Sequence, residues 1–359
     1  GVWIMAYTTI DDPSAYFQVA AYSNNGSTIT VTNDGNSDLK PDLIWNKQRT
    51  NGGYHGLWDS SRGISRSLSS NVNGSEQLSS GKGITAFNTD GFTGVEGSWA
   101  EFNQGSQTSV AWQWKVNGGT TTSLSANINS VCQVNQDAGI SIVKYTCTGG
   151  GNGQSVQHGL GLVPQVIITK NRTDASYSDW ITYHHSFGYA NFVKLNSTAA
   201  SATNSPYNQI APTSSTYNVS IDLVEATKDY VSYVFAPIQG YSKFGSYVGN
   251  GNGANGPFVY TGFKPAFVMI KVTSAVESWV MFDGARKPVN RDDNVASIYA
   301  NTNGAEYTGA SYHNLDILSN GFKVLLTNTA VNASGASYIY MAFAENPFVT
   351  STGVPTTAR

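Results

Sequence analysis

One stretch of the sequence occurs three times and limits the possible folds more than any other feature. Its copies are Lys40–Lys47, Val163–Lys170 and Lys264–Lys271, and each has proline second, a run rich in β-branched and aromatic residues, and lysine last. Proline cannot donate a backbone hydrogen bond, so it is tolerated at the start or edge of a strand. The residues that follow it favour a pleated, half-buried surface. Each copy is therefore predicted to be the central strand of one repeat.

The spacing of the copies indicates whole domains. Pro41, Pro164 and Pro265 lie 123 and 101 residues apart, which is too long for a solenoid repeat and typical of a domain. No segment has a convincing helical period, and runs of five to eight residues alternate with turn clusters. We therefore predict an all-β protein with three tandem antiparallel β-sandwich domains, jelly-roll-like and related in fold.

The predicted boundaries follow the repeat and the changes in composition. A stretch rich in Gly, Thr, Ser and Asn separates the first two repeats and is interpreted as a linker. The expected segments are an N-terminal arm (1–15), sandwich 1 (16–116), a linker (117–138), sandwich 2 (139–238), sandwich 3 (239–348) and a C-terminal tail (349–359). Three polar loops, 71–82, 196–209 and 287–308, are expected to face neighbouring molecules.

Composition excludes several classes of partner. Charged residues make up 12% of the 359 residues and the formal net charge is −3, so nucleic acid and anionic membranes are not expected as partners. No apolar run approaches the roughly 18 residues that a membrane helix needs, and no secretory signal is visible. Cys132 and Cys147 are expected to be two unpaired thiols of a protein made in a reducing cytoplasm, although a disulfide between them stays open.

Two turns each contain a carboxylate and a guanidinium group. Asp59 and Arg62 lie three residues apart, as do Asp283 and Arg286. Such pairs are expected to be structural ion pairs that fix the turn. The second repeat lacks both residues and has Tyr183–Gly188 at this place.

Aromatic side chains allow two interpretations. Those in the closing strand of each repeat alternate with other residues and are expected to be core; they are Trp112, Trp114, Tyr230, Tyr233, Phe235, Tyr338, Tyr340 and Phe343. Trp99, Trp180 and Trp279 are the candidates for contact with a glycan, provided that they are exposed.

The sequence marks no catalytic, cofactor-binding or metal-binding residue. His184 and His185 are adjacent, so on a strand they should point to opposite faces and not chelate one ion. The glycine-rich segments 149–153 and 249–256 precede no helical pattern and are interpreted as hairpin turns. No serine lies in a nucleophile-elbow motif, and no cofactor is expected.

Three phrases resemble a known family. The runs Met5–Gln18, Asn36–Trp45 and Tyr338–Phe348 are similar to virion proteins of marine tailed bacteriophages, which are built from tandem copies of one β-rich domain. The similarity covers nearly the whole chain, but these phrases are not active-site motifs and carry over no functional residue. Asn46 and Gln48 in the first repeat depart from the family pattern.

The resemblance implies a non-enzymatic virion protein, assembled in the host cytoplasm and exposed on the extracellular particle. We expect a homo-oligomeric tail fibre or surface appendage, most simply a trimer, with other virion proteins and a host surface glycan as further partners. The alternatives are a carbohydrate-binding module array on the particle and a subunit of a polymeric extracellular filament. A polysaccharide depolymerase with scattered carboxylates is a further alternative.

Overall fold

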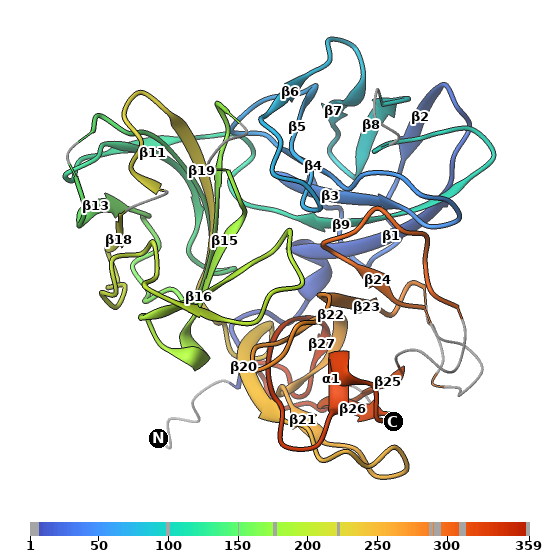
Figure 1. Ribbon diagram of the computed structural model, residues 1–359. Coiled ribbons are helices and arrows are strands. Elements are labelled where there is room, and N and C mark those ends of the chain that lie inside the picture. The colour runs from blue at the N-terminus through green and yellow to red at the C-terminus, as the bar shows by residue number, and fades with distance from the viewer. Residues whose placement is uncertain are drawn as a thin grey trace.

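The computed structural model describes residues 7–97, 101–149, 151–174, 178–220, 223–286, 290, 296–308 and 314–356. These residues form three lobes around a common centre (Figure 1). We call the lobes module 1 (16–116), module 2 (117–238) and module 3 (239–348). Each contains a large antiparallel sheet and a smaller outer sheet, which confirms the predicted class of an all-β protein with sandwich-like units.

Module 1 has a four-stranded central sheet and a three-stranded outer sheet. The central sheet has the order β1 (Phe17–Ser23), β9 (Thr108–Trp114), β3 (Leu43–Gln48) and β4 (Gly56–Asp59); the outer sheet has the order β2 (Thr28–Val31), β8 (Phe92–Val95) and β7 (Gly83–Phe87). A short pair, β5 (Arg66–Ser67) and β6 (Gln77–Leu78), follows β4, and the 3-10 turn η1 (Pro13–Ala15) precedes β1.

Module 2 repeats this plan and extends the central sheet at both edges. The order is β10 (Thr122–Leu124), β11 (Ser130–Asn135), β12 (Ile140–Thr146), β19 (Asp229–Phe235), β14 (Val166–Asn171), β15 (Ile181–His184), β16 (Asn191–Lys194) and β17 (Ala202–Thr203). The outer sheet is β13 (Gln154–Gln157) with β18 (Thr216–Val219), and the 3-10 turn η2 (His185–Phe187) follows β15.

Module 3 has the same central order. Its sheet runs β20 (Ser242–Val248), β27 (Ser337–Pro347), β22 (Phe263–Val272), β23 (Val280–Asp283) and β24 (Ile298–Tyr299), and its outer sheet runs β21 (Phe258–Tyr260), β26 (Gly321–Leu325) and β25 (Asn314–Leu318). The short helix α1 (Thr329–Asn332) precedes β27. In the described part of the chain, no helix is long and apolar enough to cross a membrane.

The predicted linker at 117–138 is wrong. β10 and β11 lie within it, and β11 pairs with β12 over six residues, from Ser130 opposite Tyr145 to Asn135 opposite Ile140. Its polar composition misled the prediction because β10 is an edge strand whose residues are mostly exposed. Cys132 lies in β11, and both Cys132 and Cys147 are buried free thiols, as expected.

The N-terminal arm and the C-terminal tail both contact the folded body. Tyr7 donates its hydroxyl to the carbonyl of Gly262 over 2.7 Å, and Ile10 is buried in the central core. In the tail, the backbone N–H of Ser351 donates to the carboxylate of Asp11 over 2.6 Å. These contacts hold the N-terminal arm against module 3 and the C-terminal tail against the arm.

The strand register aligns the sequences of the three modules residue by residue. Trp114 lies opposite both Phe17 and Leu43, Phe235 opposite Ile140 and Val166, and Phe343 opposite Ser242 and Phe267. Four residues farther along the central strand come the repeated lysines, Lys47, Lys170 and Lys271. Residues at the same register position are therefore equivalent in the three modules.

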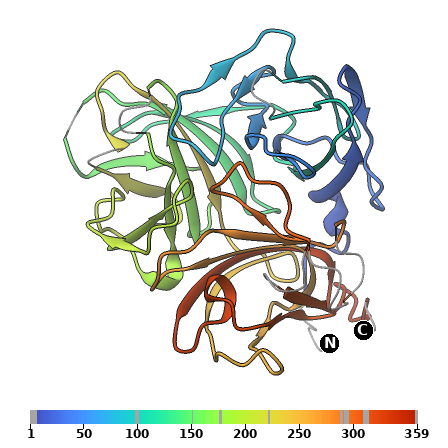
Figure 2. The same cartoon turned by 45° about the vertical axis from the view of Figure 1, so that its right-hand side comes forward.

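A single hydrophobic core joins the modules. The ring centroids of Trp114 and Phe235, Trp114 and Phe343, and Phe235 and Phe343 are 6.5, 5.6 and 5.8 Å apart, respectively, so the equivalent residues of the three modules meet in one core. Figure 2 shows the three lobes packed around a common centre. The aromatic residues of the closing strands are buried, as predicted.

Each central sheet is covered on both faces. All six residues of β3 are buried: Leu43 and Trp45 face the shared core, whereas Ile44 faces the core between the two sheets of module 1. Alternate side chains of a strand point to opposite faces. The molecule is therefore three sandwiches closed around one further core.

Candidate functional site

The two predicted ion pairs are present and completely buried. Arg286 Nε lies 2.6 Å from Asp283 Oδ2, and the corresponding atoms of Arg62 and Asp59 are in contact. In both turns the arginine backbone N–H also donates to the aspartate. The pairs fix the turns after β4 and β23, which confirms their structural role.

These pairs also join modules, which the sequence did not predict. Tyr233 of module 2 donates its hydroxyl to Asp59 of module 1 over 2.8 Å. Trp112, the module 1 equivalent of Tyr233, donates its indole N–H to Asp283 of module 3 over 2.9 Å. At the remaining junction His184 occupies the aspartate position, and its Nε2 lies 3.1 Å from the carbonyl of Tyr340 in module 3.

A second carboxylate extends each ion pair. Glu76 binds both Arg62 of its own module and Arg172 of module 2, and Glu306 of module 3 likewise binds Arg286 and Arg49 of module 1. Burial alone would raise the pKa of Glu76, but hydrogen bonds and charges from Arg172 and Arg62 lower it to about 2. Glu76 therefore stays ionised in the folded protein at neutral pH.

The repeated lysines form a third set of junction contacts. Lys47 donates to the carbonyl of Asn303 at 3.5 Å, Lys170 to that of Asn73 at 3.2 Å, and Lys271 to that of Thr198 at 3.1 Å. Each acceptor belongs to another module, so the contacts run around the ring. Burial lowers the lysine pKa values to about 8, 7 and 8, respectively.

The polar loops supply the carbonyls of these contacts. Asn73, Thr198 and Asn303 belong to the loops at 71–82, 196–209 and 287–308, and at these residues the loops contact another module of the same chain. Residues 287–289 and 291–295 of the third loop lie outside the described residues.

The tryptophan prediction is wrong for two of three residues. Trp180 and Trp279 are buried, and their indole N–H groups donate to the carbonyls of Ser69 and Lys194 in another module. His55 is their equivalent in module 1, and its Nε2 lies 3.0 Å from the carbonyl of Tyr299. Neither tryptophan face is open to a glycan; Trp99 lies outside the described residues.

His184 and His185 lie closer together than predicted. Because His185 begins the turn η2 and does not continue the strand, the two rings stack with centroids 5.2 Å apart. Each Nε2 lies within hydrogen-bond distance of a module 3 carbonyl, that of Tyr340 or Phe244. Among the described residues, no group of three or more His, Cys, Asp or Glu side chains could hold a metal ion.

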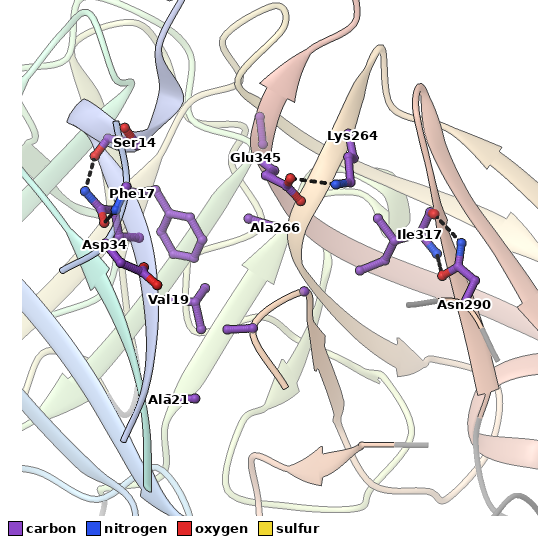
Figure 3. A pocket seen from close by; sticks show the side chains of 15 residues that line it. Ser14, Phe17, Val19, Ala21, Asp34, Lys264, Ala266, Asn290, Ile317 and Glu345 are labelled. Atoms are coloured by element: carbon purple, nitrogen blue, oxygen red, sulfur yellow. Dashed lines mark hydrogen bonds and ion pairs between the residues drawn. The ribbon is translucent and has the colours of Figure 1, made fainter. Parts of the chain in front are cut away.

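A cleft of about 410 Å³ lies between modules 1 and 3. Figure 3 shows Phe17, Val19 and Ala21 of β1 on one side and the Lys264–Glu345 ion pair toward module 3. Lys264 Nζ lies 2.6 Å from Glu345 Oε1. Further lining residues are Ser14, Gln18, Asp34, Gly35, Ala266, Gly284, Ala285, Asn290, Ile317 and Ala344.

A second surface feature lies on β21. Phe258 and Tyr260 are two residues apart, so their side chains share one face of the strand, and they are 49% and 47% exposed. Lys243 Nζ lies 5.1 Å from the ring centroid of Tyr260. We call Phe258, Tyr260 and Lys243 the β21 patch; its residues do not stand out in the sequence.

Fold and site together define a class of protein: an all-β body in which buried ion pairs, lysines and aromatic side chains hold three related modules together. A family model described as a domain of unknown function, DUF7483, matches residues 12–347, so the chain belongs to that family. The single match spans all three modules. No curated protein and no solved structure matches the chain.

Proposed function

We propose that this protein is a non-enzymatic structural component of a tailed-bacteriophage particle. It would be a homo-oligomeric tail fibre or surface appendage that serves in assembly and host attachment. The resemblance of Met5–Gln18, Asn36–Trp45 and Tyr338–Phe348 to phage virion proteins supports this assignment. Synthesis in the host cytoplasm suits the two free buried thiols, because that compartment keeps cysteines reduced.

The observation that carries the proposal is that buried ionisable groups hold the module junctions together. Asp59, Asp283, Glu76 and Glu306 are buried and bonded to arginines at module junctions. A charge held this way is costly to expose or to leave unpaired. These side chains therefore support a rigid body and are not available to a substrate.

Particle composition and assembly state test the proposal. Mass spectrometry of purified phage particles should detect this chain, and electron microscopy should place it on the tail or another surface appendage. Sedimentation of the purified protein should give a trimer. A chain absent from particles and monomeric at its highest soluble concentration would contradict the proposal, whereas self-assembly into filaments without phage would favour the extracellular filament.

A glycan-binding surface is the second candidate, favoured by the β21 patch. Flat aromatic faces pack against the apolar faces of sugar rings, and Tyr260 and Phe258 are the exposed pair on this strand. On a glycan array, Tyr260→Ala should lose any signal that the wild type gives. Tyr189→Ala is the matched control because Tyr189 is similarly exposed but belongs to module 2.

Enzyme assays separate this candidate from a depolymerase. When the protein is incubated with host capsule, it should bind the polysaccharide without releasing reducing ends. Release of reducing ends would favour the depolymerase and would contradict a purely structural role.

A further inference from the structure

The outer edge of β1 has backbone groups that need a partner. Lys115 N donates to Tyr16 O, and Asn24 N donates to Gln107 O. Hydrogen-bonded pairs alternate in an antiparallel ladder, so Phe17, Val19 and Ala21 direct their N–H and C=O groups away from β9. Among the described residues, β9 is the only strand paired with β1. All three residues line the cleft, and Figure 3 shows their side chains.

The equivalent edge in module 2 already has a strand on it. β12 corresponds to β1 because Ile140 lies opposite Phe235 as Phe17 lies opposite Trp114. β11 pairs antiparallel with the outer edge of β12 over six residues. An added strand is thus compatible with this position in the repeated architecture.

The edge in module 3 is also occupied, by a different element. Phe244 corresponds to Val19, and its carbonyl lies 3.0 Å from Nε2 of His185 in η2. Module 1 has no such cover in the described part of the chain. The turn Gly284–Ala285 lies across the cleft from β1. These two small residues leave open the space that η2 fills at the junction between modules 2 and 3.

The charged groups that line the cleft favour a basic ligand. Asp34 and Glu345 contribute two carboxylates to the cleft lining and Lys264 contributes one ammonium group. Glu345 is already paired with Lys264, and Asp34 is exposed. A basic side chain on an incoming segment therefore finds a carboxylate within the cleft.

We propose that this cleft binds an extended segment of another polypeptide, which adds to β1 as an antiparallel strand and places a lysine or arginine near Asp34. In strand addition, main-chain hydrogen bonds supply affinity and pockets for alternate side chains supply selectivity. The proposal rests on the β1 edge and the cleft, and it does not require the protein to belong to a phage particle.

The chain itself suggests the probe. A synthetic peptide with the sequence of residues 128–135 and Cys132→Ser has a strand known to fit the equivalent edge. It would carry an added terminal lysine, with a glutamate version for comparison. With the full-length protein, the lysine peptide should slow hydrogen exchange at Phe17, Val19 and Ala21, and should bind several-fold more tightly than the glutamate version at low salt.

A matched pair of proline variants tests the site. Ala21→Pro removes an outward N–H in the cleft, and Ser246→Pro does the same at the equivalent position of β20. We expect Ala21→Pro to weaken peptide binding at least tenfold and Ser246→Pro to leave it unchanged.

A third variant tests whether misfolding of β1 explains the loss of binding. Ala285→Trp fills the cleft from the opposite wall, leaves β1 unaltered and changes an exposed residue, and it should also abolish binding. Peptide binding is compared between variants that have equal melting temperatures, or after correction for the folded fraction of each variant. No exchange protection on β1 with saturating peptide, or equal losses for Ala21→Pro and Ser246→Pro, would overturn the proposal.

Discussion

The hydroxyl of Tyr233 donates to Asp59 over 2.8 Å, although the two residues belong to different modules. Arg62 contacts both of them, with Nη2 3.2 Å from the Tyr233 oxygen. A turn that is local in sequence is therefore part of a junction between modules. The ion pair contributes to the assembly of the whole body and not only to the conformation of one loop.

Arg62→Ala should strongly destabilise the protein. The change leaves the carboxylate of Asp59 buried without its counter-ion, and removing one partner of a buried pair costs about 3–5 kcal/mol. Urea unfolding followed by tryptophan fluorescence measures this loss as a change in the free energy of unfolding.

Arg66→Ala is the control for Arg62→Ala because both arginines bind Glu76. The Arg66 side chain is 39% exposed, so its loss should cost below about 1 kcal/mol. Equal effects of the two substitutions would show that burial at the junction does not determine the energy.

The shared core predicts that the three modules unfold together. Trp114, Phe235 and Phe343 bury their rings against one another, so a separated module would expose a large apolar face. Calorimetry of the full chain should give one transition whose calorimetric and van't Hoff enthalpies agree.

Expression of residues 117–238 alone should give an aggregated or poorly packed product. This expectation differs from the sequence-based prediction of three tandem domains, because a separate domain would have a complete core of its own. A soluble isolated module with dispersed NMR signals would contradict the role assigned to the shared core.

The repeat allowed the central strands to be predicted but not how their faces pack. β3 and β14 begin two residues after Pro41 and Pro164, and each ends one residue after the repeated lysine. Pro265 instead lies inside β22, where the register shifts on both sides of it. A bulge removes the need for the missing proline N–H, and sequence alone does not reveal it.

Contacts between modules were invisible for a similar reason. The equal offset of Lys47, Lys170 and Lys271 was evident, but their acceptors are backbone carbonyls of loops far away in sequence. Any residue can supply a carbonyl, so no side-chain pattern marks the acceptor. Trp180 and Trp279 were misjudged because the same carbonyl contacts turn their indoles inward.

Lys170 should make stability rise with pH above neutrality. Its pKa is about 7 in the folded protein and about 10.4 in an unfolded chain. Between these values the unfolded chain binds the proton that folded Lys170 has lost, so this one lysine makes the free energy of unfolding increase with pH by at most about 1.4 kcal/mol per pH unit. Urea unfolding at pH 7, 8 and 9 measures the slope.

Lys170→Met should reduce that slope, and Lys82→Met, which changes an exposed lysine, should retain it. Lys47 and Lys271, with pKa values of about 8, supply the part that remains in the Lys170 variant. A slope unchanged by Lys170→Met would mean that this amine is not the group that titrates.

His184 should make the protein sensitive to acid. Its Nδ1 accepts from the N–H of Ser186, so its Nε2–H donates to the carbonyl of Tyr340 and the ring is neutral. Burial lowers its pKa to about 3, against about 6.5 in an unfolded chain. Below pH 6.5 the unfolded chain therefore binds the extra proton, and stability falls as the pH falls toward 3.

His184→Gln should reduce this loss, because glutamine retains a donor and an acceptor but does not titrate. The decrease in melting temperature between pH 7 and pH 4.5 should be smaller in the variant than in the wild type. His185→Gln is the control, since that neighbouring ring is only partly buried. His158, whose pKa burial lowers to about 4, still contributes to the remaining loss. An equal decrease in wild type and His184→Gln would place the acid sensitivity elsewhere and contradict a neutral histidine at the junction between modules 2 and 3.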